Sequence, residues 1–218
     1  MRVAALYDVH GMPHALEAVL ADVDGAAVDA IVFGGDLFLG PLPAETLALV
    51  RSVDAQFVRG NCDRQEIEWV RNALGHEAVA WAAGWPTTVE LDGVLYCHAS
   101  PGDDMRPILT EASPQERFDE ALAGVDNRLV VAGHTHMQFR RERFANAGSV
   151  GMPYEDDVAA FWALVSDDVE FRRTPFDVER AIAEIEATDW PDKASFVGQN
   201  LRAAPSRREA IEHFESLV

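Results

Sequence analysis

Short apolar runs alternate with amphipathic stretches along the first two thirds of the chain. The apolar runs have the length of buried strands and lie at residues 3–7, 30–33, 55–58, 94–97 and 129–132. Between them, apolar positions recur at helical spacing over residues 13–23, 43–53, 64–74 and 114–123. Proline stands near the start of three of these helical stretches, where a helix tolerates it. The alternation predicts an α/β arrangement.

The pattern changes after Met137. Strand-like stretches then indicate β-ribbons at residues 137–146, 158–166 and 168–174, which suggest an antiparallel second layer. Amphipathic helices follow at 177–187 and 206–217, on either side of a connection that contains Pro191. Because 218 residues fit one domain, we expect a single domain with a core of about 1–176 and a helical extension of about 177–218.

Charge and cysteine content narrow the classes of function. The chain has 18 lysine and arginine residues against 37 aspartate and glutamate residues, a formal net charge of -19. This balance argues against binding to long nucleic acids, so an anionic substrate would have to be attracted locally, by bound cations. The two cysteines, Cys62 and Cys97, are too few for a disulfide framework.

No apolar run approaches the roughly 20 residues of a spanning helix, and the N-terminus lacks the pattern of a signal peptide. We therefore expect a cytoplasmic protein without a membrane partner. A homo-oligomer would be compatible with uncovered sheet edges.

Residues able to bind a metal follow each of the five apolar runs. They are Asp8-Val9-His10, Gly35-Asp36, Gly60-Asn61, His98 and Gly133-His134-Thr135-His136. Because ligand sites in open α/β sheets form at the carboxyl ends of strands, the five blocks are expected to meet in one crevice.

The spacing of these residues predicts two metal ions. Asp8 and His10 are two apart on an extended segment, so their side chains leave on the same side and can bind one ion. Asp36 could bridge that ion to a second, which Asn61, His98 and His134 would complete, while His136 would return to the first ion. Oxygen and imidazole ligands together suit divalent manganese, iron, zinc, nickel or cobalt. Two such ions about 3.5 to 4 Å apart can activate a water for attack on a phosphoryl group.

The five blocks, with Asn146-Ala147-Gly148-Ser149-Val150-Gly151 after them, resemble the motif set of calcineurin-like metallophosphoesterases, in particular the small bacterial and archaeal phosphodiesterase branch. The resemblance covers about residues 6–151. It implies a four-layer β-sandwich of two mixed sheets flanked by helices, with a dinuclear metal site at the strand ends. Carried over by position, it assigns Asp8, His10, Asp36 and His136 to one metal, and Asp36, Asn61, His98 and His134 to the other.

One residue departs from the wider family, in which a histidine after the asparagine is thought to protonate the leaving group. This chain has Cys62 there, as the small branch often does, and a thiol with a pKa of about 8.5 is a poor acid for an alkoxide. Water, His14 or Asp63 could replace it. The candidates for catalytic residues are Asn61, His98 and His14. The candidates for contact with substrate are Cys62, Asp63 and Arg64.

A second departure follows the glycine-rich block. The small branch often carries Gln-Pro-Arg there, whereas this chain has Met152-Pro153-Tyr154. No phosphate-binding arginine is therefore expected at this position.

The resemblance implies a metal-dependent hydrolase of small phosphate esters, with manganese the favoured ion and a phosphodiester the favoured substrate. A phosphomonoesterase and a dinucleoside polyphosphate hydrolase are the alternatives within the enzymes. A scaffold is the alternative of another class, because a retromer subunit shares the fold with eroded metal ligands. All seven ligand positions are filled here, which favours the enzyme.

Overall fold

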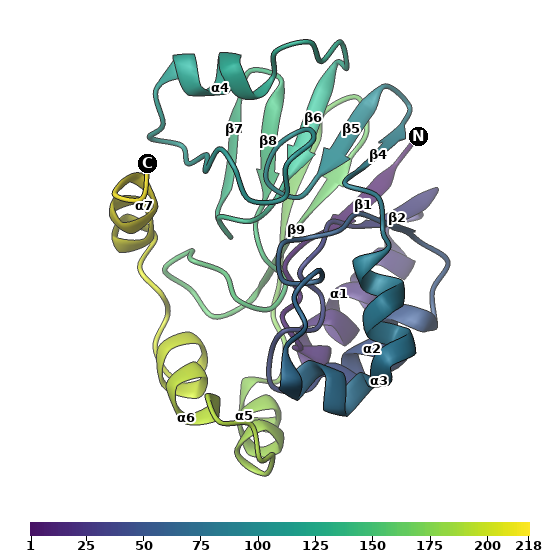
Figure 1. Ribbon diagram of the computed structural model, residues 1–218, viewed down its shortest axis with the longest axis vertical. Helices are drawn as coiled ribbons and strands as arrows, with labels where there is room; N and C mark the ends of the chain where they lie inside the picture. Colours follow the sequence, from purple (N-terminus) through teal and green to yellow (C-terminus); the bar gives the residue numbers. More distant parts are fainter.

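Two five-stranded mixed sheets form the centre of the computed structural model, which describes residues 1–218 (Figure 1). The first sheet has the order β10 (Val169–Thr174), β9 (Ala160–Val165), β1 (Val3–Leu6), β2 (Ala30–Phe33) and β3 (Gln56–Phe57). The second has the order β4 (Thr88–Leu91), β5 (Val94–Cys97), β6 (Leu129–Ala132), β8 (Phe144–Ala147) and β7 (Gln138–Arg141).

Helices cover the outer faces of both sheets. Those of the first two thirds of the chain are α1 (Pro13–Gly25), α2 (Pro43–Arg51), α3 (Glu68–Ala83) and α4 (Gln115–Ala121). The C-terminal ones are α5 (Val178–Glu186), α6 (Lys193–Phe196), the π-helical turn η1 (Val197–Leu201) and α7 (Arg207–Glu215). In Figure 1, α5, α6 and α7 follow one another along one side of the sandwich.

The alternation of side chains along the strands creates the layers. On β1, Val3 and Ala5 belong to the 13-residue core between the sheets, whereas Ala4 and Leu6 belong to the 29-residue core under the helices. A third core of eight residues, which includes Phe118 of α4, covers the outer face of the second sheet. The predicted four-layer sandwich of two mixed sheets flanked by helices is confirmed.

The prediction of a separate antiparallel layer after Met137 is wrong. The β7–β8 hairpin joins the second sheet, where β8 runs parallel to β6, but β9 and β10 join the first sheet through antiparallel pairing of β9 with β1. All six residues of β9 are buried, so this strand suits a place between two neighbours, inside the sandwich. Sequence periodicity identified these strands without identifying the sheets that they join.

The helix predicted at 64–74 begins later, because residues 61–65 form turns that hold Asp63 against neighbouring backbone. Cys62 and Cys97 are both free thiols. None of the helices has the length and apolar character needed to cross a bilayer. The C-terminal elements differ in how they attach: α5 buries Ala181, Ile182 and Ile185, whereas α7 buries no residue.

Candidate metal centre

Two neighbouring loops, after β1 and after β2, form the floor of the site. The main-chain N–H groups of Asp8, His10 and Gly11 donate to the carbonyls of Gly35, Asp36 and Leu37 at 2.9–3.0 Å, so the loops run side by side. These parallel strands end at the same edge of the sheet, as strand ends at a ligand site do.

Five of the seven residues predicted as ligands have a left-handed backbone. They are Asp8, His10, Asp36, His134 and His136, with φ between 47° and 68°. A non-glycine residue in this region costs on the order of 1 kcal/mol or more and persists only where its surroundings impose it. The repeated strain at one place indicates a site whose geometry is selected for function.

A close approach of backbone to side chain fixes the Asp36 carboxylate. A Cβ atom on Gly60 would lie 2.1 Å from Asp36 Oδ1, so only glycine fits before Asn61. The main-chain N–H of Cys62 donates to the same Oδ1 at 2.8 Å. The strand-end glycine at position 60 therefore serves to bring the loop after β3 against the loop after β2.

The buried carboxylates and imidazoles fall into two groups whose ligand atoms lie within 4.8 Å of one another: Asp8, His10 and His136, and Asp8, Asp36 and His98. In the first group, His136 Nε2 lies 3.2 Å and His10 Nε2 3.8 Å from Asp8 Oδ1. In the second, His98 Nε2 lies 3.4 Å from Asp36 Oδ2 and 3.9 Å from Asp8 Oδ1.

Hydrogen bonds orient three of these imidazoles. The Nδ1 atoms of His10, His98 and His136 lie 3.0, 2.8 and 2.7 Å from the backbone carbonyls of Leu39, Gly34 and Met152. Each Nδ1 must donate to its carbonyl, which leaves Nε2 free to bind a cation. The Nε2 atoms of His10 and His136 face each other at 3.3 Å, an arrangement that a shared cation would stabilise.

Asp8 supplies the plainest sign that a cation belongs here. Its Oδ2 accepts the main-chain N–H of His134, but its Oδ1 is buried without a hydrogen-bond partner. A buried carboxylate oxygen is costly unless it is paired or coordinates a metal. The residues present therefore fit a divalent metal.

The electrostatics of the site also fit a cation. Burial raises the pKa values of Asp8 and Asp36, but neighbouring imidazoles outweigh it and lower both. Burial lowers the pKa of His98, but the two carboxylates raise it to about 10. Burial lowers the pKa of His134 to about 4, with a further contribution from His98. Both carboxylates are therefore ionised where the cation ligands meet, with the His98 imidazolium as their counter-charge.

The remaining predicted ligands lie at the edge of this cluster. Asn61 Oδ1 lies 3.2 Å from His98 Nε2, and the His134 ring centre lies 5.2 Å from that of His98. Asn61 and His134 line a cavity of about 380 Å³, which His10, Asp36 and His136 also line. Asp36 Oδ2 lies 4.0 Å from His10 Nε2 as well as near His98, as a bridging ligand would. The proximity of Asp8 to both groups was not predicted.

The structure gives three other predicted site residues different surroundings. His14 does not line the cavity, and its Nε2 lies 3.0 Å from Glu184 on α5. Arg64 donates from Nε to both carboxylate oxygens of Asp104, at 3.1 and 3.0 Å. Cys62, by contrast, lines the cavity as expected.

Asp63 is a positioning residue, because its carboxylate faces backbone and not the cavity. It accepts the main-chain N–H groups of Asp36, Gly60 and Leu37 at 2.8, 2.9 and 3.2 Å. Burial and the Asp36 carboxylate raise the pKa of Asp63 to about 7. Its role as a substrate contact or acid, expected from sequence, is not supported by this placement.

Aromatic residues from the C-terminal part of the chain close the cavity. Tyr154 stacks on the ligand candidate His136, with ring centres 5.1 Å apart and planes at 14°. Trp190, Phe196 and Phe214 also line this cavity. Sequence reasoning missed these residues, because their spacing carries no motif.

Comparison with known proteins agrees with this geometry. A family model described as the calcineurin-like phosphoesterase superfamily domain matches residues 1–168. The chain belongs to this superfamily. It is therefore a metallophosphoesterase, from a family of enzymes that hydrolyse phosphoester bonds with divalent metals.

Similar proteins come from bacteria and archaea. The crystal structure of a metallophosphoesterase from Sphaerobacter thermophilus is 25% identical, with a TM-score of 0.77 over 94% of this chain and 100% of that one. A hypothetical protein from Pyrococcus horikoshii is 18% identical, with a TM-score of 0.77 over 90% of this chain and 96% of that one, which shows a shared fold. An uncharacterized protein of Methanocaldococcus jannaschii is 22% identical, over 90% of this chain and 98% of its own.

Proposed function

We propose that this metallophosphoesterase is a phosphodiesterase, which holds two divalent ions and hydrolyses a small, singly charged phosphodiester. The observation that carries the proposal is the charge of the cavity wall. None of the 13 residues that line the metal cavity is lysine or arginine. The charge of a bound phosphoryl group would therefore be neutralised by the metal ions alone.

The lack of basic side chains in this wall distinguishes between the candidate substrates by their charge. A diester carries one negative charge, whereas a monoester carries nearly two at neutral pH because its second pKa is about 6. A dinucleoside polyphosphate carries more charge, and enzymes commonly bind polyphosphates with arginine and lysine clamps. The absence of basic side chains favours the diester over both alternatives.

The proposed ligand sets are those that the family resemblance assigns, and the buried carboxylate and imidazole groups around Asp8 and Asp36 support them. One ion would be held by Asp8, His10, Asp36 and His136, and the other by Asp36, Asn61, His98 and His134. Manganese is the proposed ion, and iron, zinc, nickel and cobalt fit the same mixture of oxygen and nitrogen donors. A scaffold would have no need of this full set of oriented, strained ligands.

The reaction would divide between the ions and the chain. When bound, two ions supply charge neutralisation at the phosphoryl oxygens and activation of the attacking water. The chain fixes the imidazole orientations through their Nδ1 bonds, and Asp63 fixes the loops that carry Asp36 and Asn61. Burial and the Asp36 carboxylate raise the pKa of Cys62, so its thiol is a weak proton donor. Substrates whose leaving group needs little protonation should react best.

The test compares bis(p-nitrophenyl) phosphate with p-nitrophenyl phosphate, using protein loaded with Mn²⁺ and protein treated with EDTA. We expect metal-dependent hydrolysis with kcat/KM at least about tenfold higher for the diester, a difference of about 1.4 kcal/mol. Asp36→Asn should reduce the rate to that of EDTA-treated protein. Asp126→Asn, which changes an exposed carboxylate outside the cavity, is the matched control and should retain the rate.

Two results would contradict the proposal. A higher kcat/KM for the monoester would overturn the diester preference and the argument from charge. No hydrolysis of either ester by protein shown to contain metal would overturn the proposed reaction.

A further inference from the structure

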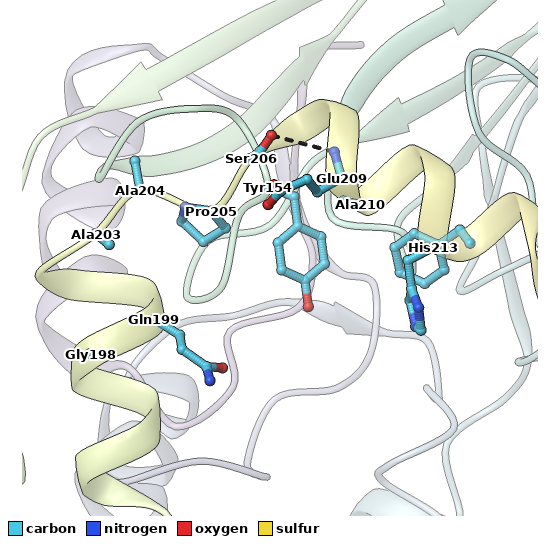
Figure 2. Close-up of a pocket in the computed structure, with 11 residues that line it drawn as sticks. Tyr154, Gly198, Gln199, Ala203, Ala204, Pro205, Ser206, Glu209, Ala210 and His213 are labelled. Atoms are coloured by element: carbon cyan, nitrogen blue, oxygen red, sulfur yellow. Dashed lines mark hydrogen bonds between the residues drawn. The ribbon is translucent and has the colours of Figure 1, made fainter.

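A second cavity, of about 630 Å³, adjoins the metal cavity. It lies between Tyr154 and the C-terminal segment Gly198–Phe214, as Figure 2 shows. Tyr154 and Phe214 line both cavities, so the two spaces meet along these side chains. The family match ends at residue 168, so the C-terminal wall lies outside the part of the chain that defines the family.

Aromatic rings lead from the metal centre into the second cavity. Tyr154 stacks on His136, and the ring centre of Phe214 lies 6.1 Å from that of Tyr154. His213 continues the series, with its ring centre 5.8 Å from that of Phe214. A flat group attached to a phosphoryl at the metals would therefore meet aromatic faces as it entered this space.

The second cavity also offers unused hydrogen-bonding groups. The Tyr154 hydroxyl, the Gln199 carboxamide and the His213 imidazole have no hydrogen-bond partner in the protein. Figure 2 shows Gln199 and His213 on opposite sides of the Tyr154 ring. These groups could bind the polar edge of a ring, whereas a purely apolar occupant would leave them unpaired.

The charge of the wall excludes a second phosphate. Glu209 is the one carboxylate among the 11 lining residues, and none is lysine or arginine. An anionic occupant would face this carboxylate without a compensating cation. An occupant without negative charge therefore fits this cavity.

The wall formed by α7 is attached from outside the cavity. Arg207 contacts Glu155 at 2.6 Å and Glu111 at 2.8 Å, and Arg117 contacts Glu215 at 3.0 Å. These ion pairs fix both ends of a helix that buries no residue of its own. Its cavity face is therefore free to contact a ligand.

We infer that the second cavity binds the organic group of the phosphodiester, and that this group is an uncharged planar ring with hydrogen-bonding edges, of the nucleobase class. The phosphoryl group lies in the metal cavity while the ring packs against Tyr154 and Phe214 and hydrogen-bonds to Gln199 or His213. This inference rests on the proposed function, because the phosphoryl group must lie at the metal centre.

The experiment measures binding to the Mn²⁺-loaded protein by calorimetry. The ligands are adenosine 5′-(methyl phosphate), thymidine 5′-(methyl phosphate), cyclohexyl methyl phosphate and dimethyl phosphate, all singly charged diesters with poor leaving groups. We expect at least one nucleoside ester to bind about tenfold or more tightly than dimethyl phosphate, and more tightly than the cyclohexyl ester. Phe214→Leu, which removes the ring but keeps an apolar side chain, and Gln199→Ala should each reduce that advantage at least threefold. Gln56→Ala, at an exposed position of β3, is the matched control and should preserve it.

The outcomes separate this inference from the proposed function. Equal binding of all four esters, or a nucleoside advantage that both variants retain, would overturn the assignment of this cavity. A cyclohexyl ester that binds as tightly as the nucleoside esters would overturn the recognition of a planar polar ring. Binding does not require turnover, so a protein that hydrolyses nothing but shows the ring preference would contradict only the proposed reaction.

Discussion

Removal of the Asp63 carboxylate should destabilise the protein and weaken metal binding, although Asp63 does not face the metal cavity. The carboxylate accepts three main-chain N–H groups, from Asp36, Gly60 and Leu37, at 2.8–3.2 Å. Asp63→Ala leaves all three donors without their partner. A buried donor that loses its partner costs about 1–3 kcal/mol.

The expected loss of unfolding free energy in Asp63→Ala follows from two opposing effects. Three unpaired donors would sum to about 3–9 kcal/mol at those values. The substitution also relieves the burial and the repulsion from Asp36 that raise the pKa of Asp63 to about 7. We therefore expect the lower end, about 3 kcal/mol, for Asp63→Ala. In Asp63→Asn the amide oxygen can keep the two bonds now made by Oδ2, so a loss of about 1 kcal/mol is expected.

The assay is urea unfolding of metal-free protein in EDTA, followed by measurement of Mn²⁺ affinity. Asp103→Ala is the matched control, because the Asp103 carboxylate also accepts two main-chain N–H groups, from Met105 and Arg106, but in an exposed loop where water can replace it. It should cost less than about 1 kcal/mol. Asp63→Ala should weaken metal binding by about 10- to 100-fold, as loss of a group that supports metal ligands does. Equal destabilisation by Asp63→Ala and Asp103→Ala, or unchanged metal affinity in Asp63→Ala, would refute the reasoning.

Three further predictions concern the metal loops and the C-terminal helix. Gly60→Ala would place a Cβ atom 2.1 Å from the Asp36 carboxylate and should lower Mn²⁺ affinity at least about tenfold, whereas Gly25→Ala, which meets no atom within 4 Å, should not. Burial opposes protonation of His98, but the carboxylates around it raise its pKa to about 10. Metal binding near pH 7 should therefore release protons and strengthen as pH rises. Calorimetry in two buffers of different ionisation enthalpy would detect the proton release, and identical heats in the two buffers would exclude it. Burial raises the pKa of Glu215, but hydrogen bonds from Ser113, Thr110 and Arg117 outweigh it and lower the pKa below its usual 4.5. The stability that Glu215 gives to α7 is therefore present above pH 4.5 and is lost as pH falls through the pKa of the folded state. Hydrogen-exchange protection of α7 should drop in that pH range before that of β1, and a simultaneous loss would contradict this.

Most strands and helices could be predicted from periodicity, whereas the two mixed sheets were implied by the resemblance to the family. The buried runs at 3–7, 30–33 and 129–132 became β1, β2 and β6, because short apolar runs followed by polar or glycine-containing blocks are typical of strands buried in a sheet. The pairing of β9 with β1 could not be predicted, because pairing across more than 150 residues leaves no local trace in the sequence. The start of α3 was misplaced for a similar reason, since the tertiary bonds of Asp63 hold residues 61–65 in turns.

The metal centre, too, could be predicted from the sequence in part, while its remaining features depend on the tertiary structure. The sequence alone determined which side chains meet, because Asp8, His10, Asp36 and the histidines after β5 and β6 all stand at strand ends that topology brings to one edge. Only the tertiary structure decided that Asp8 belongs to both ligand groups, that Asp63 supports backbone, and that aromatic residues from α7 and its neighbours wall the cavity. Strand ends follow local rules of chain geometry, whereas the position of a C-terminal helix depends on long-range ion pairs such as Arg207 with Glu111, which no spacing along the chain encodes.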